Sequence, residues 1–404
     1  MIAAIAESYS VFAGWLIDGT GSPSRENILI EIENGQICSV SDRAEDIRKE
    51  KRFLEPDMID LSGFTVVPGL VDSHVHLVMS GSADPQIRES QQIEGVEDVS
   101  QRIRTHLADH FYCGVRAVRD GGDRNAHTVR FRNFYDNPSL NSVLMNVSGK
   151  AWHKKGRYGG LIGRPPFENK TLAESILDAD EMPDQIKIVN SGLNSLSLFG
   201  KQTPPQFTLR ELKDAVDLAE RYGKKVMVHA NGVKPVEMAV AADCHSIEHG
   251  FFMGEDNLKK IAEKGLIWVP TAVTMKAYAG LMKGNPTGRI SKKNLEHQLE
   301  QIGMAREFGV KVAIGTDAGS PGVDHGKAMK DEMGLFMEAG FSVEETVRSA
   351  TSVGADLIGL KRSGRIAEGM RADFIAVKGS PLEFPKSLQS IERIYMDGKL
   401  MYTA

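Results

Sequence analysis

The sequence has few cysteines, few aromatic residues and no long hydrophobic run. Only three of its 404 residues are cysteines, Cys38, Cys113 and Cys244, which are too few and too scattered for a disulfide framework. No stretch approaches the roughly 18 apolar residues that a membrane span requires. Residues 1–6 are apolar but lack a basic leader, and Glu7 interrupts them, so no secretory signal peptide is predicted. We therefore expect a cytoplasmic protein.

The charges show no excess that would suit a polyanionic partner. Lys and Arg number 49 against 54 Asp and Glu, which gives a formal net charge of -5. Nucleic-acid binding needs clustered basic residues, and no such block occurs, so neither nucleic acid nor a membrane is an expected partner. With 41% hydrophobic residues the chain can bury a large core, and its length favours one large domain with a smaller companion.

Both ends of the chain read as short apolar strands joined by tight turns. Asn34-Gly35 and Asp397-Gly398 each separate two apolar runs, and such dipeptides are strong signals for a β-hairpin. We therefore expect one small β-sandwich domain built from residues 1–65 and 365–404. Its strands are predicted at 9–17, 28–33, 36–40, 372–377 and 391–396.

The middle of the chain alternates short apolar runs with segments of helical apolar spacing, such as 209–222 and 291–308. Strand and helix alternating eight times is the pattern of a parallel barrel, so residues 66–364 are predicted to form a (β/α)8 barrel of the TIM type, an α/β fold. The strands are predicted at 65–71, 114–119, 142–148, 185–190, 225–229, 244–249, 266–270 and 311–316.

Histidines and an aspartate stand at the ends of several of these strands. His74 and His76 close the first strand, and residues i and i+2 of a strand point to the same side, so both imidazoles can reach one metal ion. His229 ends the fifth strand, His249 the sixth and Asp317 the eighth. All of these groups fall at the face where barrel enzymes place their active sites. The alternative is a set of structural histidines with a loop-capping aspartate, which the coincidence of these positions disfavours.

Lys187 lies inside an apolar strand, between Ile186 and Ile188. An ammonium group there is costly to bury without a partner. Its neutral amine can instead react with carbon dioxide, and the two oxygens of the resulting carbamate can bridge two cations. A lysine that pairs with a carboxylate or extends to solvent is the alternative. The histidines on neighbouring strands favour the carbamate.

The motif His74-Val75-His76 after Pro68-Gly69-Leu70-Val71-Asp72, with a lysine, two histidines and an aspartate on later strands, resembles the amidohydrolase superfamily. The segment 364–374 resembles the closing sandwich of that family, so the resemblance covers nearly the whole chain. Within the superfamily, 246–250 and 315–319 look most like the branch of imidazolonepropionase-like proteins and Xaa-Pro or Xaa-Arg/Lys dipeptidases. That branch cleaves amide bonds in dipeptides, N-acyl amino acids and cyclic amides.

The resemblance implies a binuclear metal-dependent hydrolase. Two divalent cations lower the pKa of a shared water enough to give a bridging hydroxide near neutrality, and Asp317 would act as general acid and base towards the leaving amine. Nitrogen and oxygen ligands suit zinc, and manganese, iron or cobalt could also fill such a site. The resemblance assigns His74, His76 and Asp317 to one metal ion, His229 and His249 to the other, and carbamylated Lys187 to the bridge, with catalytic roles for Asp317, Lys187 and His249.

Two departures from that branch concern the substrate. Many dipeptidase-like members have an aromatic residue two positions after the strand-five histidine, where this chain has Asn231, and His153 stands where a Gly-Gly-His phrase is common. In the loop after strand three, a cation beside polar rings could bind a substrate carboxylate. The alternative is an exposed loop with solvated charge, and for Asn231 a turn residue. The predicted substrate-binding residues are His153, Arg157, Tyr158 and Asn231.

Other functions fit the same residues. The same pair of metal ions can serve lactone, ester or phosphotriester hydrolysis, since a fold does not settle the substrate. A carboxylate-binding group such as Arg157 in the pocket would favour an amide substrate. A non-catalytic scaffold is the third reading, but such relatives usually lose metal ligands, and here all six positions are filled. A small molecule is the expected partner, and the resemblance implies a homo-oligomer.

Overall fold

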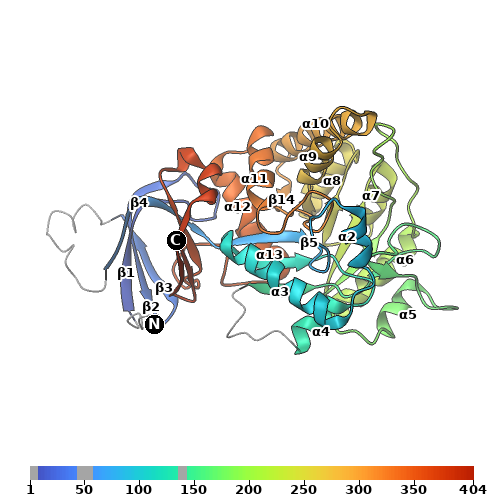
Figure 1. Ribbon diagram of the computed structural model, residues 1–404, viewed down its shortest axis with the longest axis horizontal. Helices are drawn as coiled ribbons and strands as arrows, with labels where there is room; N and C mark the ends of the chain where they lie inside the picture. Colours follow the sequence, from blue (N-terminus) through green and yellow to red (C-terminus); the bar gives the residue numbers. More distant parts are fainter. Residues whose placement is uncertain (1–7, 43–57, 135–142) are drawn as a thin grey trace. The chain divides into compact units, whose positions relative to one another are not determined.

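The computed structural model describes residues 8–42, 58–134 and 143–404 (Figure 1). The chain divides into two compact units, and the first combines both chain ends. The predicted domain limits at residues 65 and 365 stay predictions, since the division into units also assigns the helical stretch after residue 341 to the chain ends. Unit 1 comprises Met1–Val71, His110–Ala117 and Phe341–Ala404, and unit 2 comprises Asp72–Asp109 and Val118–Gly340.

Unit 1 contains a seven-stranded sheet in which strands from the two chain ends lie side by side (Figure 1). Strand β1 pairs antiparallel with β2 and parallel with β4, and β4 pairs antiparallel with β15. The predicted terminal strands and both predicted hairpins are confirmed. The order is β17-β16-β15-β4-β1-β2-β3, with β1 at Ser8–Leu16, β2 at Arg25–Glu33, β3 at Gln36–Ser41, β4 at Met58–Pro68, β15 at Phe374–Lys378, β16 at Ile391–Met396 and β17 at Lys399–Thr403.

The two hairpin turns of unit 1 approach each other closely. Gly35 has a φ of 77°, and a Cβ atom there would lie 2.5 Å from the carbonyl oxygen of Asp397 in the other turn. Only glycine fits this position, both for its backbone conformation and for the space. Behind the turns, Val11, Ile30 and Phe374 belong to the buried core of the sheet. The second layer of the expected sandwich stays a prediction.

The strands predicted from 185–190 to 311–316 pair with one another in parallel. The strands at 70–75, 115–120 and 185–189 are buried along their whole length, as in parallel sheets covered by helices. Each of the eight predicted runs overlaps a strand. They form two sheets, β5-β6-β7 and β14-β13-β12-β11-β10-β8-β9. The bounds are β5 Leu70–Val75, β6 Val115–Asp120, β7 Leu144–Val147, β8 Ala151–Trp152, β9 Gly163–Arg164, β10 Gln185–Val189, β11 Lys225–Ala230, β12 Ser246–His249, β13 Ile267–Val269 and β14 Lys311–Val312.

The first predicted barrel strand, 65–71, needs a correction. Its first part belongs to β4, which pairs with β1 and β15 in unit 1, and the barrel strand β5 begins only at Leu70. Pro68 has no N–H to donate to a ladder, and the two strands meet around it. The continuous apolar run therefore contains a change from one sheet to the next, which hydrophobicity alone cannot reveal.

Strand β5 also contacts the segment that follows β14. The backbone N–H of Ser73 donates to the carbonyl of Ile314 at 2.9 Å, and that of Asp317 donates to the carbonyl of His74 at 2.7 Å. The first and eighth predicted strands are thus neighbours, as in a barrel. Closure of all eight strands into a complete barrel stays a prediction.

Helices follow most of the parallel strands (Figure 1). The predicted helix 209–222 is confirmed as α6, but the helix predicted at 291–308 begins earlier, at Pro286, because Asn285 caps it and proline suits a first turn. No described helix is long and apolar enough to cross a membrane. The bounds are α2 Pro85–Ser90, α3 Val96–Tyr112, α4 His127–Phe134, α5 Leu172–Leu177, α6 Leu209–Arg221, α7 Val233–Ala241, α8 Glu255–Lys264, α9 Val273–Leu281, α10 Pro286–Glu307, α11 Ala328–Glu338, α12 Val343–Ala350 and α13 Ser352–Ile358.

Gly315 provides a test of the packing between β5 and its neighbour. A Cβ atom at Gly315 would lie 2.5 Å from Cγ1 of Val269 and 2.8 Å from the backbone nitrogen of His74. We expect Gly315→Ala to lower the free energy of unfolding by about 1–3 kcal/mol, measured by urea denaturation. The matched control is Gly334→Ala in α11, where a Cβ meets open space and should stabilise the helix by about 0.5–1 kcal/mol. Equal effects of the two substitutions would contradict this packing.

Candidate metal centre

His74, His76 and Asp317 bring three ligand atoms together at the end of β5. The Nε2 atoms of His74 and His76 lie 3.6 and 3.4 Å from the Oδ1 atom of Asp317, and the three ligand atoms lie within 4.8 Å of one another. Asp317 has a φ of 56°, a left-handed conformation that aspartate tolerates better than most residues. Ser320 donates to its Oδ2 atom at 3.0 Å. This geometry suits one divalent cation.

His229 and His249 form a second pair beside the first group. Their ring centroids are 4.6 Å apart, and the ring of His249 lies 4.9 Å from that of His74. His229 lies in β11 and His249 ends β12, so neighbouring parallel strands place the two rings together. The four predicted histidines and the aspartate therefore converge at the carboxyl ends of the strands.

Hydrogen bonds fix which nitrogen of each ring faces the centre. Nδ1 of His74 pairs with Oε2 of Glu248 at 2.7 Å, Nδ1 of His76 with the carbonyl of Gly122 at 3.0 Å, and Nδ1 of His249 with Oγ1 of Thr271 at 2.7 Å. These contacts leave Nε2 of each ring for a metal ion, which is the usual arrangement around a metal-bound imidazole.

His229 differs from the other three histidines. Its Nε2 atom lies 3.1 Å from the carbonyl oxygen of Gly192, so Nδ1 is the nitrogen of this ring that is left for a metal ion. Burial lowers the pKa of His229 to about 3 and places the pKa of His74 and of His249 well below the usual range. All three imidazoles are thereby kept neutral, which is the form that binds metal.

Lys187 lies at the centre of β10 and is 1% exposed. Among the residues that the structure describes, its Nζ atom has no hydrogen-bond partner, and the same is true of Nε2 of His74. Burial lowers the pKa of Lys187 to about 8, partly offset by the negative charge of Glu248. Two orphaned buried atoms of this kind are costly unless a further group satisfies them. The donor set of neutral imidazoles, a carboxylate and a buried amine fits divalent metal ions.

The sequence analysis did not find a buried ion pair between Arg119 and Glu248 that supports the candidate ligand His74. Glu248 accepts a hydrogen bond from Nη1 of Arg119 at 3.0 Å, and all side-chain atoms of both residues are shielded from solvent. Nε of Arg119 donates to Gln185 at 2.6 Å, and the hydroxyl of Ser246 donates to Glu248 at 2.5 Å. The signal was present, since Arg119 and Glu248 are charged residues inside apolar strands, and such residues need partners.

All six candidate ligands line one cavity of about 360 Å³. Its wall is mostly apolar and includes Val78, Phe251 and Met275. Arg88 and Tyr278 also line it, and the sequence analysis found neither, because they lie in helices α2 and α9 outside any recognisable motif.

Two of the four predicted substrate-binding residues line this cavity. Tyr158 does so, with its ring 5.3 Å from that of His229, and so does Asn231. Asn231 also links two loops, because its Oδ1 atom accepts from the N–H of Phe251 at 3.0 Å. His153 and Arg157 do not line the cavity: His153 pairs with the carbonyl of Lys154, and Arg157 is exposed and donates to the carbonyl of Pro204.

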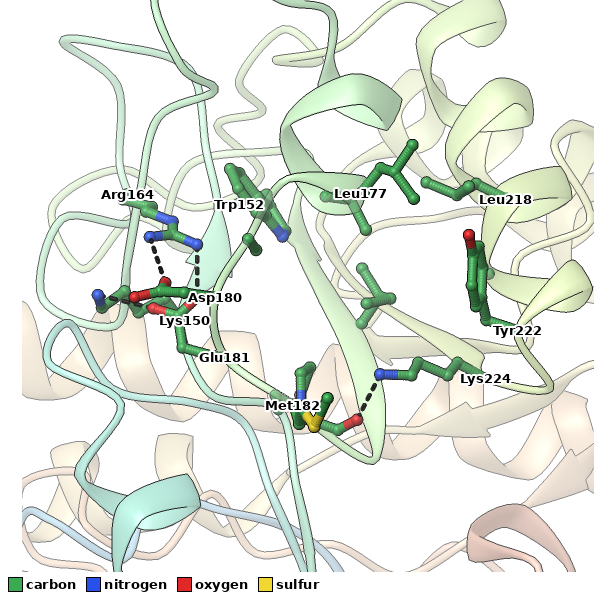
Figure 2. Close-up of a pocket in the computed structure, with 16 residues that line it drawn as sticks. Lys150, Trp152, Arg164, Leu177, Asp180, Glu181, Met182, Leu218, Tyr222 and Lys224 are labelled. Atoms are coloured by element: carbon green, nitrogen blue, oxygen red, sulfur yellow. Dashed lines mark hydrogen bonds and ion pairs between the residues drawn. The ribbon is translucent and has the colours of Figure 1, made fainter.

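Figure 2 shows a second cavity, of about 240 Å³, between α5, α6 and β10. Ile186 lines it, and because neighbouring strand residues point to opposite sides, it lies on the side of β10 away from Lys187. Its cations already have partners: Lys150 and Arg164 pair with Glu181, and Lys224 donates to the carbonyl of Pro183. This cavity therefore offers no free charge for catalysis.

Comparisons with known proteins agree with the geometry. Residues 65–401 match the amidohydrolase family. The chain is 26% identical to ochratoxinase of Aspergillus niger, over 96% of this chain and 86% of that protein, and 21% identical to imidazolonepropionase of Aliivibrio fischeri, over 86% and 85%. The crystal structure of a Xaa-Pro dipeptidase with bound methionine in its active site matches with a TM-score of 0.81 and 27% identity, over 98% of this chain and all of that chain.

The Glu248–His74 hydrogen bond provides a test of how the centre is held. We expect Glu248→Gln to weaken the binding of zinc by about 10–100-fold, because the amide no longer stabilises the orientation and basicity of the His74 ring. Titration against a competing chelator measures this change. Because the substitution also leaves Arg119 buried without its counter-charge, the double variant Arg119→Met/Glu248→Gln should regain stability but not zinc affinity. Unchanged zinc binding in Glu248→Gln would argue against this role.

Proposed function

Since the chain belongs to the amidohydrolase family, we propose that it hydrolyses an amide C–N bond of a small molecule at a centre of two divalent metal ions. The observation that carries this proposal is the convergence of four histidines, Lys187 and Asp317 in one cavity. The names of its relatives support an amide substrate, since one of them is a Xaa-Pro dipeptidase. Dipeptides, N-acyl amino acids and cyclic amides are the proposed substrate classes.

The candidate ligands are assigned to two metal ions. His74, His76 and Asp317 would hold the first ion, and His229 with His249 the second. Zinc suits these nitrogen and oxygen donors. When bound, the two ions would lower the pKa of water and polarise the substrate carbonyl.

Lys187 would join the two halves of the site as a carbamate. Burial lowers the pKa of its amine to about 8, so a sizeable fraction is neutral near neutral pH and can attack carbon dioxide, releasing one proton. The product carries a negative charge and two oxygens where the free amine has no partner. This change converts a costly buried amine into a bridging ligand.

Asp317 is the group best placed to move the proton. Burial raises the pKa of Asp317, and the hydroxyl of Ser320 holds its Oδ2 atom at 3.0 Å while Oδ1 faces the imidazoles. It would accept a proton from the attacking water and deliver it to the nitrogen of the leaving amine. The neutral amine then departs from the new carboxylic acid.

A substrate library tests the proposed reaction. Purified protein with zinc supplied would be incubated with dipeptides, N-acyl amino acids, cyclic amides, lactones and phosphotriesters, and the products identified by mass spectrometry. We expect turnover of one amide class. Turnover of lactones or phosphotriesters alone would replace the amide assignment, and no turnover of any class by metal-loaded protein would favour a non-catalytic scaffold.

Asp317→Asn tests the proton transfer. The amide keeps the size of the side chain but cannot accept and release a proton in this way, so we expect kcat for the amide substrate to fall by about 100-fold or more. Because Asp317 is also a proposed metal ligand, kcat is compared at equal metal content, measured by elemental analysis on the same samples. The control is Ser320→Ala, which removes only the hydrogen bond to Oδ2 and should cost much less. Similar losses in both variants would mean that Asp317 acts mainly through its position.

Lys187→Ala tests the bridge. Without the amine no carbamate can form, so the variant should lose metal and activity together. Short carboxylic acids such as acetate should restore part of both, because their two oxygens can occupy the position of the missing carbamate. Metal content by elemental analysis and turnover would be measured on the same samples. Full activity in Lys187→Ala would remove the carbamate from the proposal.

A further inference from the structure

Arg88 is a cation in the wall of the cavity that contains the candidate metal ligands. It lies in α2, is half-buried, and faces both this cavity and a shallower one beside it. Its Nη1 atom donates to the carbonyls of Ser80 at 3.0 Å, Ser82 at 3.2 Å and Gly319 at 3.0 Å. Within the described part of the chain, no carboxylate pairs with it. Nη1 thus holds the guanidinium group of Arg88 in place, and the positive charge of this group is left for a ligand.

The anchor places Arg88 on the Asp317 side of the metal centre. Gly319, which accepts from Arg88, lies two residues after Asp317. Tyr278 of α9 lines both cavities together with Arg88. The charges of Asp317 and Arg88 both influence the pKa of Tyr278, in opposite directions, which puts the three groups within electrostatic range of one another.

Near His229 the cavity is lined by two leucines as well as by polar side chains such as Asn231. Gly192, whose carbonyl contacts His229, is followed by Leu193, and Tyr158, whose ring packs on His229, is followed three residues later by Leu161. Both leucines line the cavity, yet Leu193 is 59% and Leu161 56% exposed. Exposed leucines at the mouth of a binding cavity mark a surface that an apolar ligand group would cover.

We infer that Arg88 binds the carboxylate of the substrate, and that the substrate is an N-acyl amino acid with a bulky apolar acyl group. This inference rests on the proposed amide hydrolysis. The acyl group lies over Leu161 and Leu193 on the His229 side, and the amino acid lies on the side of Arg88 and Asp317. An arginine fork is well suited to a carboxylate, and the ion pair removes the cost of a half-buried lone cation.

This position of the amino acid is consistent with hydrolysis of the amide C–N bond. The oxygen of water joins the acyl carbon, the C–N bond breaks, and the proton goes to the nitrogen of the amino acid. That nitrogen and the carboxylate are separated by a single carbon, so a carboxylate held by Arg88 keeps the leaving nitrogen near Asp317. Arg88 thus takes the role that the sequence analysis gave to Arg157, which does not line the cavity.

A pair of uncleavable ligands tests the inference. N-(phenylsulfonyl)-L-leucine and its neutral primary amide replace the scissile amide by a sulfonamide, and their affinities for the purified protein are measured by calorimetry. We expect the acid to bind about ten-fold or more tightly than the amide, because a charge-assisted hydrogen bond to Arg88 contributes about 1.5–3 kcal/mol. Arg88→Gln should abolish this preference, and Arg157→Gln, the matched control on the exposed loop, should leave it unchanged.

A second variant covers the case in which Arg88→Gln loosens the loop that the arginine anchors. Tyr278→Glu leaves the three carbonyl contacts of Arg88 in place but adds a carboxylate that competes for its charge, so the preference for the acid should fall in the same way. A preference retained in either folded variant overturns the inference, because the carboxylate then binds elsewhere, for example at the metal ions.

The outcomes also separate this inference from the proposed function. Amide turnover without any preference for the acid would overturn the role of Arg88 and leave amide hydrolysis standing. A preference for the acid that depends on Arg88, in a protein that hydrolyses no amide, would support the binding site and overturn the proposed reaction.

Discussion

The site is built around buried polar atoms that the protein itself does not satisfy. Nζ of Lys187 and Nε2 of His74 are enclosed and find no hydrogen-bond partner in the described ranges 8–42, 58–134 and 143–404. An arrangement of this kind costs folding free energy, and it is stable only if something else binds to these atoms. The strands hold the atoms in place, because parallel neighbours such as β10, β11 and β12 align their carboxyl ends. Metal binding and folding are therefore expected to be coupled.

Buried charges next to the candidate ligands must also be balanced. A centre that gathers cations and neutral imidazoles needs negative charge close by, and Glu248 provides it to His74 at 2.7 Å. Arg119 then compensates Glu248 at 3.0 Å, so the ion pair adds no net charge to the interior. Arg88, in contrast, pairs with no carboxylate among the described residues, and its guanidinium in the cavity wall donates only to backbone carbonyls. We propose that this charge binds the substrate.

The sequence predicted the strands and the convergence of the candidate metal ligands in one cavity better than it predicted the other residues that line this cavity, for a physical reason. Candidate ligands such as His229 and His249 lie at the carboxyl ends of apolar strands, so local periodicity already places them at one face. Arg88 and Tyr278 come from helices, where no periodicity marks the face that reaches a cavity. Arg157 has suitable chemistry, but its loop carries it to solvent. The predicted start of the first barrel strand was wrong, because one apolar run around Pro68 contributes residues to two sheets.

The most direct test of the account is a crystal structure of the zinc-loaded protein with anomalous diffraction data collected at the zinc edge. The account predicts two anomalous peaks in each chain, one between His74, His76 and Asp317 and one beside His229 and His249. It also predicts extra electron density continuous with Nζ of Lys187. A single peak, or an unmodified lysine between two ions, would contradict the bridged centre, and no peak within this cavity would contradict the metal site altogether.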